Sequence, residues 1–283
     1  MKNFFLLICA DGLRLKNYKI IRLKVLGLMI LSLMILPLIP GCGGNSARLD
    51  KIVIGIDDEF APMGFRNEKN EIVGFDVDLA KEAGRRMDVQ IEFKPIDWDN
   101  KEFEITSGNI DMIWNGCDIM PEYKEYMIFS RPYMDNRQIL LVRKDNPKNI
   151  HSVGDLAGKI VGTQSGSNSE TYINQNSGLK KSFAEFKTYR NIKEGFDALN
   201  KGEFDVLIID EIAGRYELSR HPGTMEVIEA TVGSVTEFGI GFRKDNTDLR
   251  DRVQKVFDEM ITDGTAKKIS EQWFNADLIK SRR

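Results

Sequence analysis

Two polar segments follow apolar runs at positions where ligands are often bound. Asp210 comes directly after Val206–Ile209, and the carboxyl end of a strand is a common ligand position in α/β proteins. A charge placed there, out of water, needs a partner of opposite sign. The sequence therefore makes Asp210 a candidate ligand-binding residue. The alternative is a solvated aspartate that caps the next helix.

A loop rich in hydroxyl and amide groups is the second candidate. Gly166-Ser167-Asn168-Ser169 follows a predicted strand and precedes a helical stretch. Its backbone amides and hydroxyls could therefore bind an anion at a helix N-terminus. An ordinary N-cap explains the same serines. The loop predicts either one wall of a ligand site or the start of a helix.

Metal and redox chemistry have little support in the sequence. His151 and His221 are too few and too far apart in sequence to indicate a zinc site. Cys9 and Cys42 belong to the leader, so the folded body keeps only Cys117 and can form no internal disulfide. No basic residue adjoins Cys117, which favours a small buried side chain over a reactive thiol. We expect neither a metal nor a cofactor.

From Lys51 onward, short apolar runs rich in β-branched residues alternate with segments of helical period. This alternation predicts a largely parallel α/β fold. The predicted strands are Ile52–Ile56, Ile91–Pro95, Met112–Trp114, Gln138–Arg143, Ile160–Thr163, Phe183–Thr188, Val206–Ile209 and Phe238–Phe242. Two cores are indicated, because Gln138–Arg143 opens a new run of alternating elements that closes near Val235.

Two helical patterns are clear. Within Gly74–Met87 an apolar residue recurs at every fourth position, and Asp76 and Asp78 fall in the first turn, where the helix dipole favours negative charge. A second apolar stripe ends at Asp263-Gly264. It comprises Leu249, Val253, Val256, Phe257, Met260 and Ile261. We expect each helix to pack one face on a core.

The first 41 residues have the composition of a secretory signal peptide. Basic residues up to Lys24 precede an apolar run of about 15 residues, which is shorter than the ~20 residues of a membrane-spanning helix. Ile39-Pro40-Gly41-Cys42 resembles a bacterial lipobox and predicts lipidation of Cys42, followed by a tether over residues 42–50. The alternative is an uncleaved N-terminal anchor. Both place the protein outside the cytoplasm and on a membrane.

The charge of the chain argues against nucleic acid as a partner. The chain carries 40 basic and 43 acidic residues, a formal charge of −3. Residues 1–41 hold six of the basic residues and one of the acidic residues, so their removal leaves 34 basic and 42 acidic residues and a charge of −8. An acidic body of this kind has no broad basic surface to offer nucleic acid.

Several motifs, each weak alone, form a specific ordered set. Gly74-Phe75-Asp76-Val77-Asp78-Leu79-Ala80-Lys81-Glu82 resembles the signature helix of the polar amino-acid-binding proteins within the bacterial extracellular solute-binding proteins, family 3. The further matches are Ile54-Gly55-Ile56-Asp57 with Ala61-Pro62, Asp111-Met112-Ile113-Trp114-Asn115-Gly116, Phe129-Ser130-Arg131-Pro132-Tyr133, Val161-Gly162-Thr163-Gln164-Ser165-Gly166-Ser167, and Phe204-Asp205-Val206 leading to Asp210-Glu211. The resemblance runs from about Lys51 to Phe274.

This resemblance implies a periplasmic-binding-protein type II fold, an α/β fold with two lobes joined by two crossover strands. The lobes would close on a ligand by hinge motion. Lobe 1 would take residues 48–136 and 235–283, and lobe 2 residues 137–234. The crossovers would lie near Asn136–Arg143 and Gly233–Gly239. The implied function is that of a monomeric substrate-binding protein that delivers an amino acid or related small amine to the permease subunits of an ABC importer.

The resemblance also implies a ligand site. Asp210 matches the carboxylate that binds the ligand's ammonium group, and Asp57 matches an aspartate that touches the ligand's side chain. Phe60 and Trp114 match aromatic walls of the pocket, with core packing as the alternative for Trp114. The other candidates would supply amides or hydroxyls to a ligand carboxylate, and they are Asn115, Gly116, Ser167, Asn168 and Ser169.

One segment departs from the family. Where the family has a hydroxyl residue and an arginine for the ligand's carboxylate, this chain has Asp118 and Tyr123. A hydrogen bond involving a charged group contributes about 1.5–3 kcal/mol and a neutral one roughly 0.5–1.5 kcal/mol, so Tyr123 replaces the arginine only in part. Two like charges at ~4 Å cost about 4 kcal/mol at an effective dielectric constant near 20, so Asp118 disfavours a carboxylate.

The three carboxylates Asp57, Asp118 and Asp210 together predict a cationic ligand that lacks an α-carboxylate, or an amino acid bound in a changed pose. In the alternative, Asp118 points away from the site. The backbone amides of residues 116–118 and 167–169 would then hold an ordinary carboxylate.

Two other functions compete with transport. A branch resembling this family dehydrates a cyclohexadienyl acid in the same cleft, which requires a general acid. The position equivalent to that acid is Ser169 and the arginine is absent, so we expect no enzyme. The fold also serves as the extracellular part of signalling receptors. Because about nine residues follow Phe274, we expect a sensory role only through a partner.

Overall fold

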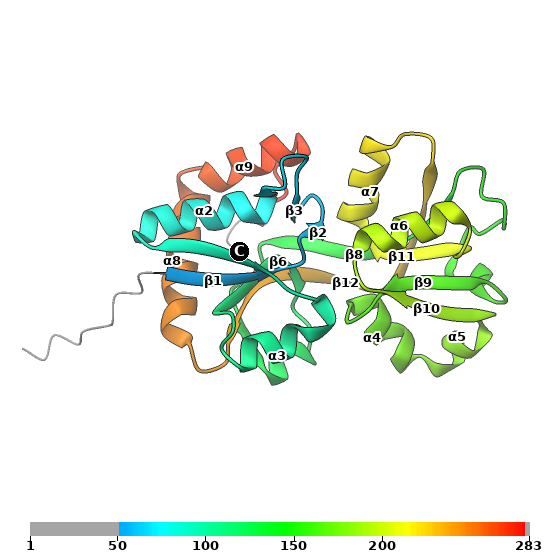
Figure 1. Ribbon diagram of the computed structural model, residues 1–283, viewed down its shortest axis with the longest axis horizontal. Coiled ribbons are helices and arrows are strands. Elements are labelled where there is room, and N and C mark those ends of the chain that lie inside the picture. The colour runs from blue at the N-terminus through cyan, green and yellow to red at the C-terminus, as the bar shows by residue number, and fades with distance from the viewer. Residues whose placement is uncertain (1–50, 281–283) are drawn as a thin grey trace, which may run out of the picture. The chain divides into compact units, whose positions relative to one another are not determined.

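Nine strands form one mixed sheet in the computed structural model, which describes residues 51–280 of the chain (Figure 1). The strand order is β10-β9-β11-β8-β12-β6-β1-β5, and β7 pairs with β12. The bounds of these strands are β1 Lys51–Ile56, β5 Gln90–Pro95, β6 Met112–Asp118, β7 Met127–Phe129, β8 Met134–Arg143, β9 Ile160–Gln164, β10 Glu185–Tyr189, β11 Val206–Asp210 and β12 Met225–Arg243. A small second sheet consists of β2 Glu59–Phe60, β3 Gly64–Arg66 and β4 Ile72–Val73.

The sheet is less parallel than the sequence predicts. β1 pairs in parallel with β5 and β6, and β9 pairs in parallel with β10 and β11. β8 and β12 are antiparallel to each of their neighbours. The reason lies in the chain path: the chain enters the β9, β10 and β11 group through β8 and leaves it through β12. The two connecting strands therefore run in opposite directions, and the prediction of a largely parallel sheet is wrong.

The predicted strands all exist, and most are longer than predicted. The largest difference is β12, which spans Met225–Arg243 rather than Phe238–Phe242. Its pairing with β8 shifts register between Val232 and Thr236, and Gly233 within this interval has a φ of 76°. The irregularity falls in a predicted crossover. The lobe boundaries at residues 136 and 235 stay predictions.

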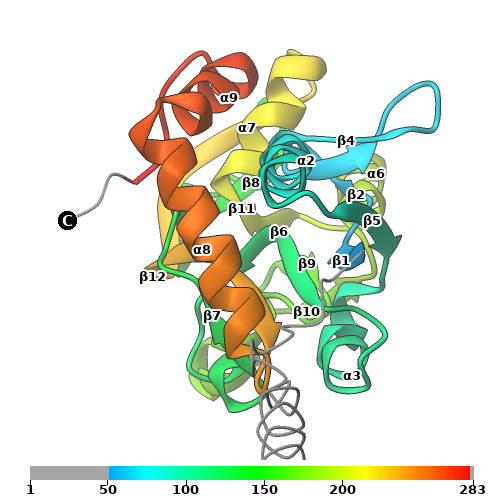
Figure 2. The same ribbon diagram turned by 90° about the vertical axis from the view of Figure 1, so that its left-hand side faces the viewer.

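Helices accompany each part of the sheet. The helix bounds are α2 Phe75–Met87, α3 Lys101–Thr106, α4 Asn168–Gln175, α5 Ser177–Ser182, α6 Ile192–Lys201, α7 Glu211–Arg220, α8 Thr247–Thr262 and α9 Thr265–Phe274. In Figure 1, α2, α8 and α9 lie beside the β1, β5 and β6 group, whereas α4, α5, α6 and α7 lie beside the β9, β10 and β11 group. Figure 2 shows α8 running along the β6 and β12 side. Each group of strands thus has its own helices.

The start of α2 is fixed by backbone geometry. Gly74 precedes the helix with a φ of 147°, and a Cβ at this position would lie 2.3 Å from the carbonyl oxygen of Met63. Only glycine fits such a position. Phe75 and Leu79 on the predicted apolar face are fully buried, which confirms the helical pattern.

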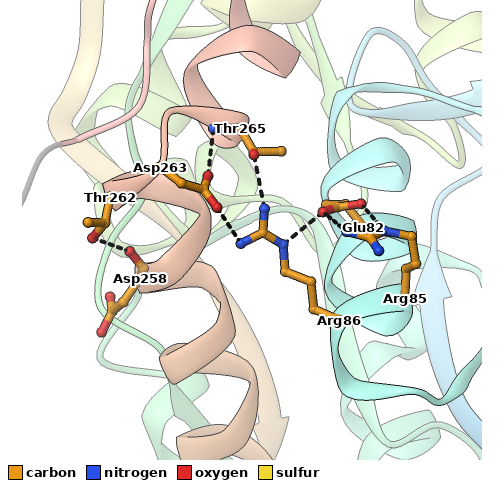
Figure 3. A network of polar contacts seen from close by, with 7 residues as sticks. All are labelled: Glu82, Arg85, Arg86, Asp258, Thr262, Asp263 and Thr265. Atoms are coloured by element: carbon orange, nitrogen blue, oxygen red, sulfur yellow. Dashed lines mark hydrogen bonds and ion pairs between the residues drawn. The ribbon is translucent and has the colours of Figure 1, made fainter.

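A polar network joins the outer ends of α2, α8 and α9 (Figure 3). The Arg86 guanidinium donates to Glu82 at 2.7 Å, to Asp263 at 2.7 Å and to the Thr265 hydroxyl at 2.9 Å. Hydrogen bonds from Arg85 and Arg86 lower the pKa of Glu82 to about 2. The network ties α2 to the turn between α8 and α9, which comes almost 180 residues later in the chain.

The core contains two segregated clusters and one that crosses the sheet. Leu140, Val161 and Val206 belong to a cluster on β8, β9 and β11, while Ile105 and Ile113 belong to one between α3 and β6. The largest cluster includes residues from both ends of the sheet. The predicted signal peptide, Cys42 and the tether lie outside the described residues. Within residues 51–280, no helix is long and apolar enough to cross a membrane.

Candidate functional site

A small cavity lies where strand ends and loops from both groups of strands meet. It is lined by Asp57, Phe60, Trp98, Gly116, Asp118, Tyr123, Gln164, Ser167, Asn168 and Asp210. Eight of these ten described residues are among the eleven predicted from the sequence. The structure therefore brings together the ends of β1, β6 and β11 and the loop that follows β9.

Two of the three predicted carboxylates meet within this cavity. The Asn136 side-chain amide, from β8, donates to Asp118 at 3.1 Å and also to Asp210. The Thr236 hydroxyl, from β12, donates to Asp118 at 2.5 Å. The Gln138 amide donates to Asp210 at 2.7 Å. The two connecting strands thus supply neutral donors that hold two carboxylates close together.

Burial perturbs the protonation of this pair. Removal from water raises the pKa of Asp118 to about 7, and the nearby Asp210 carboxylate adds to the effect. Burial also raises the pKa of Asp210 above its ordinary value. Both shifts have the sign expected for carboxyls that lack a positive partner. A cation placed between the two carboxylates would reverse these shifts.

The third carboxylate, Asp57, lies at the end of β1. It accepts a hydrogen bond from the Gln164 amide at 2.7 Å and one from the backbone amide of Glu59 at 3.1 Å. Burial nevertheless raises its pKa to about 6. Gln164 ends β9, so this contact joins the two groups of strands across the cavity. The sequence motif contained Gln164 but gave it no role.

Tyr123, at the position where the resemblance implies an arginine, is hydrogen-bonded within the protein. The Tyr123 hydroxyl donates to the carbonyl oxygen of Gly166 at 2.9 Å. The Lys101 ammonium, from the first residue of α3, donates to the same oxygen at 2.6 Å. Lys101 also lies over the Tyr123 ring, with Nζ 4.6 Å from its centroid. Sequence reasoning missed Lys101, which is 4% exposed.

The serines after β9 support the helix-cap interpretation. The Ser167 hydroxyl accepts from the backbone amide of Glu170 at 3.2 Å and caps α4. Ser167 and Asn168 still line the cavity, but Ser169 does not. The Ser169 hydroxyl instead donates to the side-chain oxygen of Gln138, and the side-chain NH2 group of Gln138 donates to Asp210. Ser169 therefore orients a cavity residue indirectly.

Gly116 connects the cavity to the signature helix. Its backbone amide donates at 2.7 Å to Asp76 of α2, and the Tyr133 hydroxyl donates to the same carboxylate oxygen at 2.9 Å. Asp76 is fully buried, and burial raises its pKa to about 7. The aspartate of the signature motif thus holds the strand backbone at the cavity wall.

Substitution of Gly116 by alanine should damage the site. Gly116 has a φ of 55°, and a Cβ there would lie 2.6 Å from the Phe60 ring. A non-glycine residue in this conformation costs about 1–3 kcal/mol. We expect G116A to lower the free energy of unfolding in urea by this amount and to weaken ligand binding. The control is G178A, because a Cβ at Gly178 meets no atom within 4 Å; equal stability of the two variants would contradict the expectation.

Trp114 and Asn115 do not line the cavity. Trp114 is fully buried and packs edge-to-face on Phe257 of α8, with ring centroids 5.7 Å apart. The prediction of a pocket wall at Trp114 is therefore corrected to core packing, and Trp98 supplies a cavity aromatic instead. Asn115 is also fully buried, and its side-chain oxygen accepts from the backbone amide of Asp57 at 2.9 Å. Asn115 therefore holds the backbone of Asp57 in place without lining the cavity.

Truncation of Trp114 should affect stability rather than ligand choice. Replacement of a buried tryptophan by alanine typically costs about 3–5 kcal/mol. We expect W114A to lose this much in urea unfolding, with the relative affinities of different ligands unchanged. The control is F103A, because Phe103 is 64% exposed. A W114A variant of normal stability but altered ligand preference would return Trp114 to the site.

A second, larger hollow of about 960 Å³ lies over α7, α8 and the two connecting strands. Its charged side chains include Arg137, which pairs with Glu211 at 2.6 Å, and Lys280, which pairs with Asp135 at 2.6 Å. Successive side chains of a strand point to opposite sides of the sheet. In β8, Asp135 and Arg137 line this hollow, whereas the amides of Asn136 and Gln138 donate to the cavity carboxylates. Because its charged side chains pair with one another, the larger hollow is a weaker candidate for a ligand site than the small cavity lined by Asp57, Asp118 and Asp210, called the acidic cavity below.

Within residues 51–280, no three His, Cys, Asp or Glu side chains are placed so that together they could hold a metal ion. Cys117 is buried, and burial raises the pKa of its thiol to about 12. A thiol in this state is a poor nucleophile.

Comparison with known proteins identifies the family. The family model for bacterial extracellular solute-binding proteins, family 3, matches residues 52–276, and the chain belongs to this family. The L-cystine-binding protein TcyJ of Escherichia coli (strain K12) is 30% identical over 230 residues, which cover 81% of this chain and 84% of that protein.

Solved structures agree with this assignment. An ABC uptake transporter substrate-binding protein from Streptococcus pneumoniae with bound histidine superposes with a TM-score of 0.79 and 32% identity, over 84% of this chain and 99% of the other. An ancestral arginine-binding protein bound to arginine gives a TM-score of 0.74 and 34% identity, over 80% and 98%. The fold is that of the periplasmic amino-acid-binding proteins.

Proposed function

We propose that this protein is the extracytoplasmic substrate-binding component of an ABC importer and holds an amino acid or related small amine in the acidic cavity. The observation that carries the proposal is the convergence of Asp57, Asp118 and Asp210 on one cavity. The binding proteins described above have amino-acid ligands in their names or structures. An ammonium group leaving water needs the charge partners that these carboxylates offer.

The cavity volume supports capture by closure. The cavity encloses about 20 Å³, whereas small-molecule pockets usually measure roughly 300–1,000 Å³. A ligand therefore enters only when the walls separate. Contacts between the two groups of strands, such as the one from Gln164 to Asp57, would then break and form again around the ligand. The permease subunits would distinguish the two states.

The cellular setting follows from the leader. We propose export by the signal peptide over residues 1–41, lipidation at Cys42 and tethering of a monomeric body to the outer face of a bacterial membrane. Labelling of the expressed protein with a radioactive fatty acid tests this part. Incorporation in the native chain and its loss in C42A would support the proposal, and equal labelling of both would contradict it.

The ligand is testable by calorimetric titration of the purified body with amino acids, polyamines and guanidines at pH 8. A ligand that binds only the folded state raises the free energy of unfolding by RT ln(1 + [L]/Kd). A ligand with a micromolar Kd at millimolar concentration should therefore add about 4 kcal/mol, which thermal unfolding would detect. We expect at least one amine-bearing compound to bind in the micromolar range or tighter. If every member of the panel fails to bind the folded protein, the proposal is wrong.

Enzymatic dehydration is a weaker alternative. The described relatives are binding proteins. At the position that resembles the catalytic acid of the dehydratase branch, the Ser169 hydroxyl is hydrogen-bonded to Gln138. Rapid conversion of prephenate or arogenate by the purified protein would reverse this ranking.

A further inference from the structure

All of the ionisable side chains that line the acidic cavity, apart from the phenol of Tyr123, are carboxylic acids. Three of its ten described lining residues are carboxylic acids, and none is basic. The side-chain amides that line the cavity are hydrogen-bonded to other protein groups. The Gln164 amide donates to Asp57, and the Asn168 amide donates to the Thr236 hydroxyl at 3.4 Å. The cavity therefore offers three acceptors to a cation and no positive partner to an anion.

The ammonium group of Lys101 lies over two aromatic residues of the cavity lining and is hydrogen-bonded to other protein groups. Lys101 forms no ion pair with an acidic side chain in the part of the chain that the structure describes, and it is absent from the cavity lining. Its ammonium donates to the carbonyl oxygens of Gly166 and Trp98, at 2.6 Å and 3.2 Å. It also lies 5.3 Å from the centroid of the Trp98 ring. Protein carbonyls and aromatic faces satisfy this buried charge without a ligand.

The Gly166 carbonyl receives hydrogen bonds from two groups that could otherwise bind a ligand carboxylate, Lys101 and Tyr123. An ammonium from α3 and the Tyr123 hydroxyl meet this single oxygen, as they would meet an oxygen of a bound anion. Gly166 is held in place: its amide donates to Glu170 at 2.7 Å, and a Cβ on it would lie 2.8 Å from Cα of Asp99. This carbonyl comes from the loop after β9, so the contact also joins the two groups of strands.

We infer that the ligand is a small cationic amine without an α-carboxylate, and that the Gly166 carbonyl takes the two hydrogen bonds that such a carboxylate would receive. This inference rests on the proposed function and narrows its ligand class. A ligand carboxylate would have to displace Gly166 and would face Asp118 as well. A positive group between Asp118 and Asp210 meets only favourable charge.

The first test compares amino acids with their own decarboxylation products. Calorimetric titrations at pH 8 would use arginine with agmatine, lysine with cadaverine and histidine with histamine. For the pair that binds best, we expect the amine to bind about tenfold tighter or more, because it avoids an unpaired carboxylate. Equal affinities, or tighter binding of the amino acid, would overturn the inference and leave the proposed function intact. No binding by any of the six, nor by any other member of the panel of amino acids, polyamines and guanidines, would overturn both.

The second test asks what the Tyr123 hydroxyl binds. In Y123F the hydrogen bond to Gly166 is lost, and we expect the same loss of affinity, about two- to tenfold, for both members of the best pair. A loss confined to the amino acid would show that the hydroxyl binds its carboxylate and would overturn the inference. Unchanged affinities would overturn the role of the Gly166 carbonyl. The matched control is Y126F, because Tyr126 is a ring neighbour of Tyr123 outside the cavity lining.

The third test restores the family's chemistry. We expect the double variant D118T/Y123R to gain amino-acid affinity by about tenfold or more and to bind the corresponding amine more weakly, because a guanidinium and a hydroxyl replace a carboxylate and a phenol. Circular dichroism and thermal unfolding establish that the variant is folded. A folded variant with the native ligand ranking would contradict the assignment of these two positions to specificity.

Discussion

D210N is expected to weaken binding of an amine ligand by about 100-fold while the protein becomes more resistant to unfolding. The loss of affinity follows from removal of one charge of a buried charge pair, which typically costs about 2–5 kcal/mol. The gain in stability has a separate cause. Asp210 lies near Asp118, its pKa is raised by burial, and neutral amides from Asn136 and Gln138 surround it. An uncharged side chain of the same shape removes the repulsion.

The measurement is a calorimetric titration of D210N with the best ligand, together with thermal unfolding of the ligand-free protein. The matched control is D145N, because Asp145 is exposed. We expect the control to change neither quantity. Native affinity in D210N would remove Asp210 from the ligand site. A lower melting temperature would show that its charge stabilises the ligand-free fold.

Acidification is expected to weaken ligand binding by about tenfold per pH unit between pH 7 and pH 5. The reason is that a cation binds the ionised carboxylates, whereas burial raises the pKa of Asp118 to about 7 and that of Asp57 to about 6 in the ligand-free protein. Each unit of pH below a pKa reduces the ionised fraction about tenfold. A proton and the ligand therefore compete for the same site.

The stability of the ligand-free protein should follow pH in the opposite direction. A raised carboxyl pKa means that the folded state binds more protons than the unfolded state between about pH 4 and pH 7. The contribution of Asp118 and Asp57 is fully present below the ordinary carboxyl pKa and is lost as the pH rises through about 6 to 7. Thermal unfolding from pH 4 to pH 8, with and without ligand, measures both slopes.

The control for both slopes is D118N, because the Asn136 and Thr236 donors still find an oxygen acceptor on the new side chain. We expect this variant to reduce the pH dependence of the remaining affinity. Titration in two buffers of different ionisation enthalpy at pH 6.5 should also show proton release on binding in the native protein. A native affinity that is constant from pH 5 to pH 8 would contradict the competition between proton and ligand.

Much of the fold was predictable because it depends on local patterns. The β-branched run of β1 and the four-residue period of α2 are both properties of neighbouring residues, and the structure confirms both elements. The convergence of Asp57, Asp118 and Asp210 was predictable for a different reason. Each lies at the carboxyl end of a strand, which is a common ligand position in α/β proteins. Because β11 runs opposite to β1 and β6, the carboxyl ends of the two groups of strands face each other at the cavity.

The remainder depends on distant neighbours. Trp114 is the last residue of its predicted strand, but β6 continues to Asp118, and Trp114 packs in the core against distant residues such as Phe257. The role of Lys101 depends on the Gly166 carbonyl, 65 residues away. Asn136 is a neutral residue whose importance appears only when two carboxylates lie on either side of it. No local periodicity carries such information.

The signature helix illustrates how a motif can be recognised before its role is understood. The family motif identifies Asp76, and its first-turn position alone predicts only a favourable interaction with the helix dipole. The structure instead shows a buried carboxylate that accepts hydrogen bonds from Gly116 and Tyr133. Its contribution to the fold is to fix the backbone of β6 beside the cavity. A motif residue can thus determine the shape of a site without lining it.

The single thiol of the described residues has a practical consequence. Cys117 sits on β6 between Gly116 and Asp118, and its side chain belongs to the cluster that includes Ile105 and Tyr123. Because the thiol is shielded and rarely ionised, maleimide can modify it only during transient local unfolding of this strand. The rate of Cys117 modification, followed by mass spectrometry, would report how often the segment of β6 beside the cavity unfolds locally. A ligand that contacts Gly116 and Asp118 should slow this modification, and the assay requires no engineered cysteine.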